Sequence, residues 1–261
     1  MINREYVLTA AHCLDGFSDA KVKTLTLYLG LSDWSAYDPE SWFPEGFRAQ
    51  VDETFIHPSY ESPEHYFDVA LFKMDEKMFW SYEVQPVCLP EVPVRDLAKR
   101  VGDSVTLAAF GGTDCTQKSN NETKSNTKLS ATTLEVFSYQ YCNDYIQQLG
   151  GTDFLPDGFI SNILCVGSNV IIIFSKLFFF LALLKLFLFI QLGGHSSCPG
   201  DSGGPLVKSK EDSDGKRYHE QIAVVGGATK DKKVGFYARL EDAEILNWVY
   251  DVAFGRHGTY F

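Results

Sequence analysis

The chain has 261 residues, of which 45% are hydrophobic, and its formal net charge at pH 7 is −11. This length and composition suit one large domain with a sizeable core, and the acidity argues against a nucleic-acid-binding protein. The six cysteines indicate disulfide bonds and therefore an exported protein. The glycosylation sequon that begins at Asn121 agrees with export. Residues 1–6 lack the apolar run of a signal peptide.

The hydropathy pattern predicts a chain made mainly of strands. Residues 21–29 alternate polar and apolar side chains, which is typical of a half-buried strand. Further strands are expected at 51–57, 68–73 and 101–112. Near the end of the chain, apolar residues recur at helical spacing over 241–253 and predict a helix.

Three short motifs contain residues suited to nucleophilic catalysis. His12 lies in Ala-Ala-His-Cys, Asp68 precedes an apolar strand, and Ser202 lies in Gly-Asp-Ser-Gly-Gly. A serine hydroxyl needs a base, and the base needs a group that orients it. The N–H groups of Gly200 and Ser202 can form an oxyanion hole. Taken singly, the three motifs also fit a core histidine, a capping aspartate and a glycine turn.

Two other histidines are rival bases. His57 precedes a proline at the end of a strand, and His65 lies three residues before Asp68. Neither has the Ala-Ala-His-Cys context of His12, so both rank below it.

In the order His, Asp, Ser, these motifs resemble those of the chymotrypsin-like serine proteases, in the style of arthropod extracellular members. Segments 84–90 and 235–239 are also similar to that family. The resemblance implies an all-β fold of two six-stranded antiparallel β-barrels with a C-terminal helix. Ser202 would be the nucleophile, His12 the general base and Asp68 the group that fixes the imidazole tautomer.

The same resemblance implies an extracellular endopeptidase that acts through an acyl-enzyme. Its substrates would be proteins, and its partners would include serpin-type inhibitors and an upstream activating protease. No cofactor and no metal ion is implied. The alternative from another class is a non-catalytic, protease-like regulator, which the altered substrate strand described below favours.

The resemblance also assigns a specificity pocket. Ser196, six residues before the nucleophile, would form its floor, and Gly227 and Gly235 would line its wall. A serine floor leaves the pocket uncharged, so we expect a preference for large apolar residues. Val224-Val225-Gly226-Gly227-Ala228 stands where the resemblance implies the Ser-Trp-Gly of the substrate strand, with the register open by one residue. The tryptophan is lost, and with it the serine that supports the catalytic aspartate.

Two strands and an Ile-Val-Gly-Gly-type amino terminus would precede Met1 in the family. The chain is therefore expected to be N-terminally truncated, with an incomplete first barrel. Asp201 would bind the α-amino group that activation cleavage creates.

The cysteines are also interpreted through the resemblance. Cys13 and Cys88 would lack their partners, and Cys142 would pair with Cys165. A bridge between Cys115 and Cys198 is a hypothesis for the two that remain.

The single domain, residues 1–261, is interrupted by an apolar insertion at about 168–191. Residues 170–190 are long enough to span a bilayer, but they contain two lysines and lie beside the pocket. Removing 168–191 shortens the spacing between Cys165 and Cys198 to one typical of the family. A retained intron therefore ranks first, a membrane span second and a functional insertion third.

Overall fold

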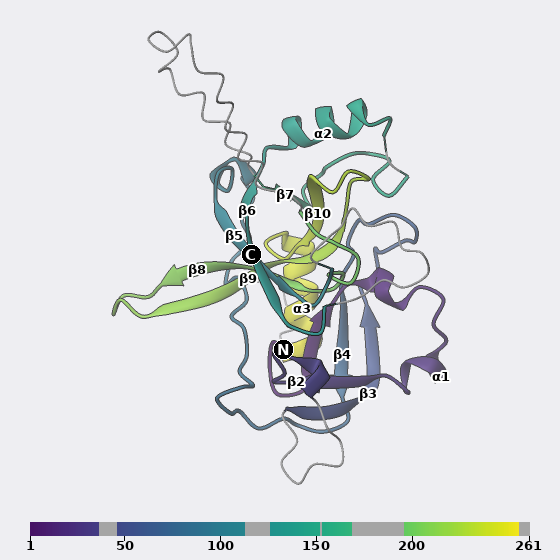
Figure 1. The fold of residues 1–261 in the computed structure, drawn as a ribbon, viewed down its shortest axis with the longest axis vertical. Coiled ribbons are helices and arrows are strands. Elements are labelled where there is room, and N and C mark those ends of the chain that lie inside the picture. Colours follow the sequence, from purple (N-terminus) through teal and green to yellow (C-terminus); the bar gives the residue numbers. More distant parts are fainter. Residues whose placement is uncertain (37–45, 113–125, 152, 169–195, 256–261) are drawn as a thin grey trace, which may run out of the picture.

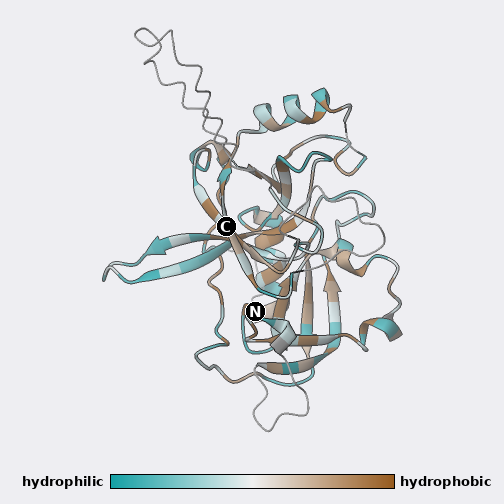
Figure 2. Ribbon diagram, viewed as in Figure 1, coloured by the Kyte–Doolittle hydropathy of each residue, from teal (hydrophilic) through white to brown (hydrophobic). Residues whose placement is uncertain are grey.

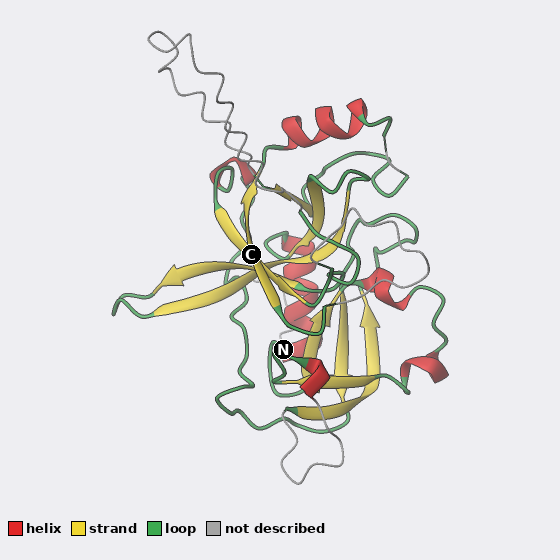
Figure 3. Ribbon diagram, in the orientation of Figure 1, coloured by secondary structure: helices red, strands yellow, loops and turns green. Residues whose placement is uncertain are grey.

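The computed structural model describes residues 1–36, 46–112, 126–151, 153–168 and 196–255. Within them the chain forms two β-sheets with a long helix between them (Figures 1 and 3). No helix of the described residues has the length and apolar character needed to cross a membrane. Residues 170–190 lie outside the described part.

The first sheet has four antiparallel strands in the order β1-β4-β3-β2. Their bounds are Tyr6–Thr9, Thr26–Leu29, Phe47–Ile56 and Ala70–Met74 for β1 to β4. This half-barrel agrees with the predicted incomplete first barrel.

The second sheet closes into a barrel in the order β10-β7-β6-β5-β8-β9. Its strands from β5 to β10 are Ser104–Ala109, Ser130–Val136, Ile163–Gly167, Pro205–Glu211, Arg217–Ala228 and Val234–Arg239. The β8–β9 hairpin projects from the barrel with a largely hydrophilic outer part (Figure 2). The mostly β architecture with a closed second barrel confirms the predicted fold class.

The C-terminal helix α3 (Ala243–Phe254) packs against both sheets and confirms the predicted helix. Asp242 caps its first turn by accepting the backbone N–H groups of Glu244 and Ile245. Its buried face shares one core cluster with apolar residues of the half-barrel and the closed barrel. Because this helix touches both sheets, it helps fix how one sheet sits against the other.

Two local predictions were incomplete. The range 21–29 begins in a helical turn, α1 (Asp19–Val22), and becomes a strand only at β2. A longer helix, α2 (Tyr139–Gln148), was not predicted. Only Cys142 and Ile146 are buried in it, and most of its other residues are polar, so its sequence offers few strongly apolar positions that would mark a helix. Short single-turn helices η1 (Ala11–Leu14), η2 (Trp34–Ala36) and η3 (Leu97–Lys99) complete the described elements.

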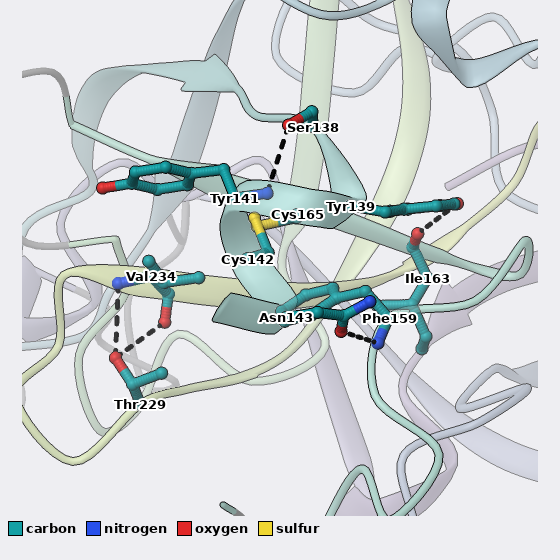
Figure 4. The surroundings of a disulfide bond; sticks show 10 residues. All are labelled: Ser138, Tyr139, Tyr141, Cys142, Asn143, Phe159, Ile163, Cys165, Thr229 and Val234. Carbon is teal, nitrogen blue, oxygen red and sulfur yellow. Dashed lines mark hydrogen bonds between the residues drawn. A yellow bond between two sulfur atoms is a disulfide. The ribbon is translucent and has the colours of Figure 1, made fainter. Parts of the chain in front are cut away.

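A disulfide bond joins α2 to β7, as predicted. Cys142 and Cys165 are both fully buried, and their Cα atoms lie 6.6 Å apart (Figure 4). The first turn of α2 is capped by Ser138, whose hydroxyl accepts the Tyr141 N–H at 3.2 Å. The bridge therefore attaches a solvent-facing helix to the wall of the closed barrel.

We expect the double substitution Cys142→Ala/Cys165→Ala to lower the free energy of unfolding by roughly 3 kcal/mol, because the bridge closes a loop of intermediate length in the unfolded chain. Urea denaturation measures the change. Cys88→Ala, which removes an exposed free thiol, is the matched control and should leave the midpoint unchanged. Equal midpoints for the double variant and the wild type would contradict a structural role for the bridge.

Candidate active site

Strand pairing brings His12 and Asp68 together. β1 runs antiparallel to β4, with Thr9 at the end of β1 opposite Ala70 at the start of β4. His12 lies in η1, which follows β1, and Asp68 lies just before β4. Both side chains therefore lie at the same edge of the four-stranded sheet.

Asp68 orients the imidazole ring of His12. Nδ1 of His12 lies 2.7 Å from Oδ2 of Asp68, and the His12 backbone N–H donates to Oδ1 at 2.8 Å. An ionised carboxylate only accepts hydrogen bonds, so Nδ1 of His12 carries the proton. Nε2 is then the basic nitrogen, which is the tautomer that a general base requires.

The electrostatics of the pair favour a proton on His12. The side chain of Asp68 is 0% exposed. Burial alone would raise the pKa of Asp68, but hydrogen bonds from His12 and His65 outweigh it and lower that pKa. Burial likewise opposes protonation of His12, but the hydrogen bond and charge of Asp68 prevail and raise the pKa of His12. Asp68 therefore stabilises the imidazolium form of His12, the form that a proton transfer to Nε2 would produce.

A second histidine contacts the same carboxylate. Nδ1 of His65 lies 2.9 Å from Oδ2 of Asp68, and the His65 and His12 ring centroids are 4.8 Å apart. Sequence reasoning weighed His65 only as a rival base and missed this contact. Its place three residues before Asp68 was the one available signal, and spacing within a loop does not fix where a side chain points.

His57, the other rival base, is a core residue. It is 2% exposed, stacks on Phe67 at a centroid distance of 4.9 Å and meets Trp248 edge-on at 5.0 Å. Burial lowers the pKa of His57, and its Nδ1 accepts the Ser59 N–H at 3.2 Å. Within the described residues no hydrogen bond links it to Asp68, so the neutral ring serves packing.

The turn that carries Ser202 is held against β9 and the half-barrel. The Gly203 N–H donates to the Val225 carbonyl at 2.9 Å, and the Val225 N–H donates to the Gly204 carbonyl at 3.0 Å. Gly203 has a φ of +77°, and a Cβ there would come within 2.4 Å of Thr9 Oγ1. Only glycine allows this approach, which places the turn beside the residues that lead into η1.

Ser202 is exposed, and no hydrogen bond joins its hydroxyl to His12 in the described part of the chain. Nε2 of His12 instead lies 3.8 Å from the Sγ of Cys13. The backbone N–H groups of Gly200 and Ser202 donate to no described residue, so both are available to an oxyanion. Catalytic hydrogen bonds are often loose before substrate binds and tighten in the complex.

The expected pocket floor carries no charge. Ser196 is 1% exposed, and its hydroxyl donates to the Lys232 carbonyl at 3.1 Å. Its own carbonyl accepts the Tyr237 hydroxyl at 2.7 Å. Gly235 is confined to glycine in this packing, because a Cβ there would come within 2.5 Å of the Tyr237 ring.

The neighbouring β9 residues lack side chains where the family pattern has a serine and a tryptophan. A Cβ on Gly227 would lie 2.7 Å from the Phe236 ring, so that ring occupies the adjacent space. A Cβ on Gly226 would lie 3.3 Å from Oδ2 of Asp68. Position 226 therefore adjoins the Asp68 carboxylate.

Asp201 borders a separate pocket. It is 9% exposed, and its carboxylate accepts the N–H groups of Gly111 at 2.9 Å and Cys198 at 2.7 Å. Burial raises its pKa against the effect of these two hydrogen bonds. The pocket has a volume of about 230 Å³. None of the ion pairs among the described residues involves Asp201.

His12, His65 and Asp68 also form the one group of potential metal ligands in the described ranges, with ligand atoms within 4.8 Å of one another. Their Nδ1 and Oδ2 atoms already share hydrogen bonds. A metal ion held by these atoms would have to break the His12–Asp68 pair. We assign no metal to this site.

The remaining predictions concern four cysteines and the glycosylation sequon. Cys13 and Cys88 are free thiols in the described structure. Asn121 and Cys115 lie outside the described residues. The sequon and the Cys115–Cys198 bridge therefore stay predictions.

Comparison with known proteins was made against families and individual relatives. The sequence profile of the family described as Trypsin matches residues 1–170 and 186–249. The unmatched stretch between them falls inside the apolar segment. The human protein named transmembrane protease serine 5 is 28% identical over 95% of this chain, which spans 44% of that protein's length.

Two arthropod proteins have similar levels of sequence identity to this chain. The clotting factor G beta subunit of Tachypleus tridentatus is 25% identical over 98% of this chain and 70% of its own length. The CLIP domain-containing serine protease B9 of Anopheles gambiae is 28% identical over 80% of this chain and 44% of its own length. With the profile covering most of the sequence, the chain belongs to the trypsin family of serine proteases.

Proposed function

We propose that the protein is an extracellular serine endopeptidase that uses Ser202, His12 and Asp68 as a catalytic triad. The observation that carries this proposal is the fully buried Asp68 carboxylate, which holds His12 in the tautomer of a general base. The glycine turn with Ser202 lies against the same edge of the half-barrel. The Cys142–Cys165 disulfide supports the extracellular location.

In the reaction, Nε2 of His12 takes the proton of the Ser202 hydroxyl while Oγ attacks the carbonyl carbon of the scissile peptide bond. Asp68 stabilises the imidazolium that forms. His12 then gives its proton to the leaving amine, and an acyl-enzyme remains on Ser202. Water, activated by His12, hydrolyses the ester and restores the serine.

The Gly200 and Ser202 N–H groups would stabilise the oxyanion of each tetrahedral intermediate. Neither donates to a described residue, and the +94° φ of Gly200 requires glycine for this backbone orientation. Losing one such donor typically slows catalysis by roughly 100- to 1000-fold. The binding of protein substrates and serpin-type inhibitors would follow from the same geometry.

We further infer that Asp201 receives an α-amino group in the adjoining pocket, linking activation by an upstream protease to the oxyanion hole. Among the described residues its carboxylate accepts hydrogen bonds from the Gly111 and Cys198 amides, and its remaining lone pairs can accept an ammonium group. An added Ile-Val dipeptide should increase turnover, whereas N-acetyl-Ile-Val should not. An equal response to the two peptides would contradict this role of Asp201.

We expect a fluorophosphonate probe to label the wild-type protein and to leave Ser202→Ala unlabelled, because only an activated serine attacks the phosphorus centre. Gel fluorescence and peptide mass mapping measure the label. Cys13→Ala is the matched control, since it removes the thiol beside His12 and keeps the serine. Two results would favour the non-catalytic regulator. One is equal labelling of the wild type and Ser202→Ala; the other is no labelling of either protein when Ile-Val is present.

The uncharged floor at Ser196 predicts a preference for large apolar residues on the amino side of the cleaved bond. Peptide substrates that differ only in Phe or Arg at that position should show a higher kcat/KM for Phe. Burying an arginine against a pocket without a carboxylate leaves its charge unpaired. A higher kcat/KM for the Arg substrate would refute this assignment of the pocket.

A further inference from the structure

We propose that His65 is a positioning residue of the active site, acting as the second side-chain donor that holds Asp68 in place of a donor from residue 226. This inference rests on the proposed peptidase function, because Asp68 matters for turnover only if His12 is the base. It extends that function by adding a residue outside the triad.

Asp68 accepts three hydrogen bonds within the described residues. The His12 backbone N–H reaches Oδ1 at 2.8 Å, and the two Nδ1 atoms of His12 and His65 reach Oδ2 at 2.7 and 2.9 Å. Without His65, Oδ2 would keep one side-chain donor, and that donor is the ring it must orient. Oδ2 could then move with that ring, because the backbone N–H of His12 holds only Oδ1.

The tautomer of His65 follows from the chemistry of its partner. A carboxylate accepts and does not donate, so Nδ1 of His65 must carry a proton. Because Nδ1 is committed to Asp68, this nitrogen cannot serve as the base for Ser202. The contact therefore makes His65 a supporting donor and removes it as a rival of His12.

The His65 ring is itself held in place. It is 8% exposed and lies edge-on between Phe154 and Phe236, with both centroid distances at 5.1 Å. Its backbone N–H donates to the Phe154 carbonyl at 2.9 Å. Because these contacts hold the His65 ring in place, its Nδ1–H can in turn hold the Asp68 carboxylate.

The loop is bent to make this contact. Phe67 has a φ of +52°, a conformation that costs energy for a residue with a side chain. The Phe67 carbonyl accepts the Val69 N–H at 2.7 Å. This reversal sits directly before Asp68 and lets the side chain three residues earlier lie over the same carboxylate.

On the opposite side of Asp68 lies Gly226, which has no side-chain donor for Oδ2; His65 supplies that hydrogen bond instead. A Cβ built on Gly226 would lie 3.0 Å from the Phe236 carbonyl oxygen, 3.3 Å from Oδ2 of Asp68 and 3.4 Å from Nδ1 of His65, so the backbone there must yield by a few tenths of an ångström. A hydroxyl at position 226 would therefore reach the same oxygen, but glycine has no donor there. The two positions are alternative sources of one hydrogen bond.

The kinetic test compares His65→Leu with His65→Asn. Both variants lose the ring and its aromatic contacts, but the asparagine amide keeps an N–H donor at the δ position where Nδ1 stood. We expect His65→Leu to lower kcat roughly tenfold with KM within about twofold of the wild type, as for a lost hydrogen bond to a charged group. His65→Asn should recover most of that loss. All assays contain EDTA, so that no metal bridges the histidines.

Adding Gly226→Ser to His65→Leu should also restore kcat, because the serine hydroxyl supplies the donor from the other side. Equal kcat values for His65→Leu and His65→Asn, with no gain from Gly226→Ser, would reduce His65 to a packing residue. Thermal unfolding of each variant verifies that folded proteins are compared.

A measurement without turnover separates this inference from the proposed function. In ¹⁵N-histidine-labelled protein, the spectrum should show Nδ1–H protons for both His12 and His65, and Asp68→Asn should shift both. If the wild type turns over substrate no faster than Ser202→Ala, the proposed function fails and this spectrum alone decides the role of His65. A His65 signal in the Nε2–H form would overturn the inference.

Discussion

The proposed active site depends on one buried carboxylate. Asp68 has no exposed surface, and its charge is stable there only because three hydrogen bonds replace the water it has lost. Removing any of these donors would leave a lone pair of a buried charge unsatisfied, which is far more costly than losing a surface contact. The hydrogen bonds from His12 also fix the tautomer and orientation of its ring. The bonds that stabilise the Asp68 charge therefore also orient the proposed base.

The two sheets meet around this carboxylate. The half-barrel supplies Asp68 and His12 through the β1–β4 pairing, and the closed barrel supplies the Ser202 turn and Gly226 through β8 and β9. Helix α3 packs on both sheets through a shared core cluster. The geometry of the proposed site therefore depends on how the sheets sit together, and a methyl group added at Gly203 would clash with Oγ1 of Thr9 in the half-barrel.

The sequence predicted those parts of the candidate site that short local motifs define. The motifs around His12 and Ser202, the uncharged Ser196 and the helix over 241–253 are readable from neighbouring residues. The role of His65 was not, because it depends on a backbone reversal at Phe67 and on the absence of a side chain at Gly226, far away in the chain. Helix α2 was missed because it is mostly polar, buries only Cys142 and Ile146, and is anchored by a disulfide to a distant strand.

The most direct test of the triad is to trap the acyl-enzyme. The protein, with the Ile-Val dipeptide present, is mixed with a p-nitrophenyl ester at neutral pH, quenched in acid and mapped by peptide mass spectrometry. In acid His12 is protonated and cannot activate water, so the ester should survive. The account predicts an acyl group on the peptide that contains Ser202 and its loss in His12→Ala. An acyl group found on Cys13, or on no residue of the wild type, would contradict it.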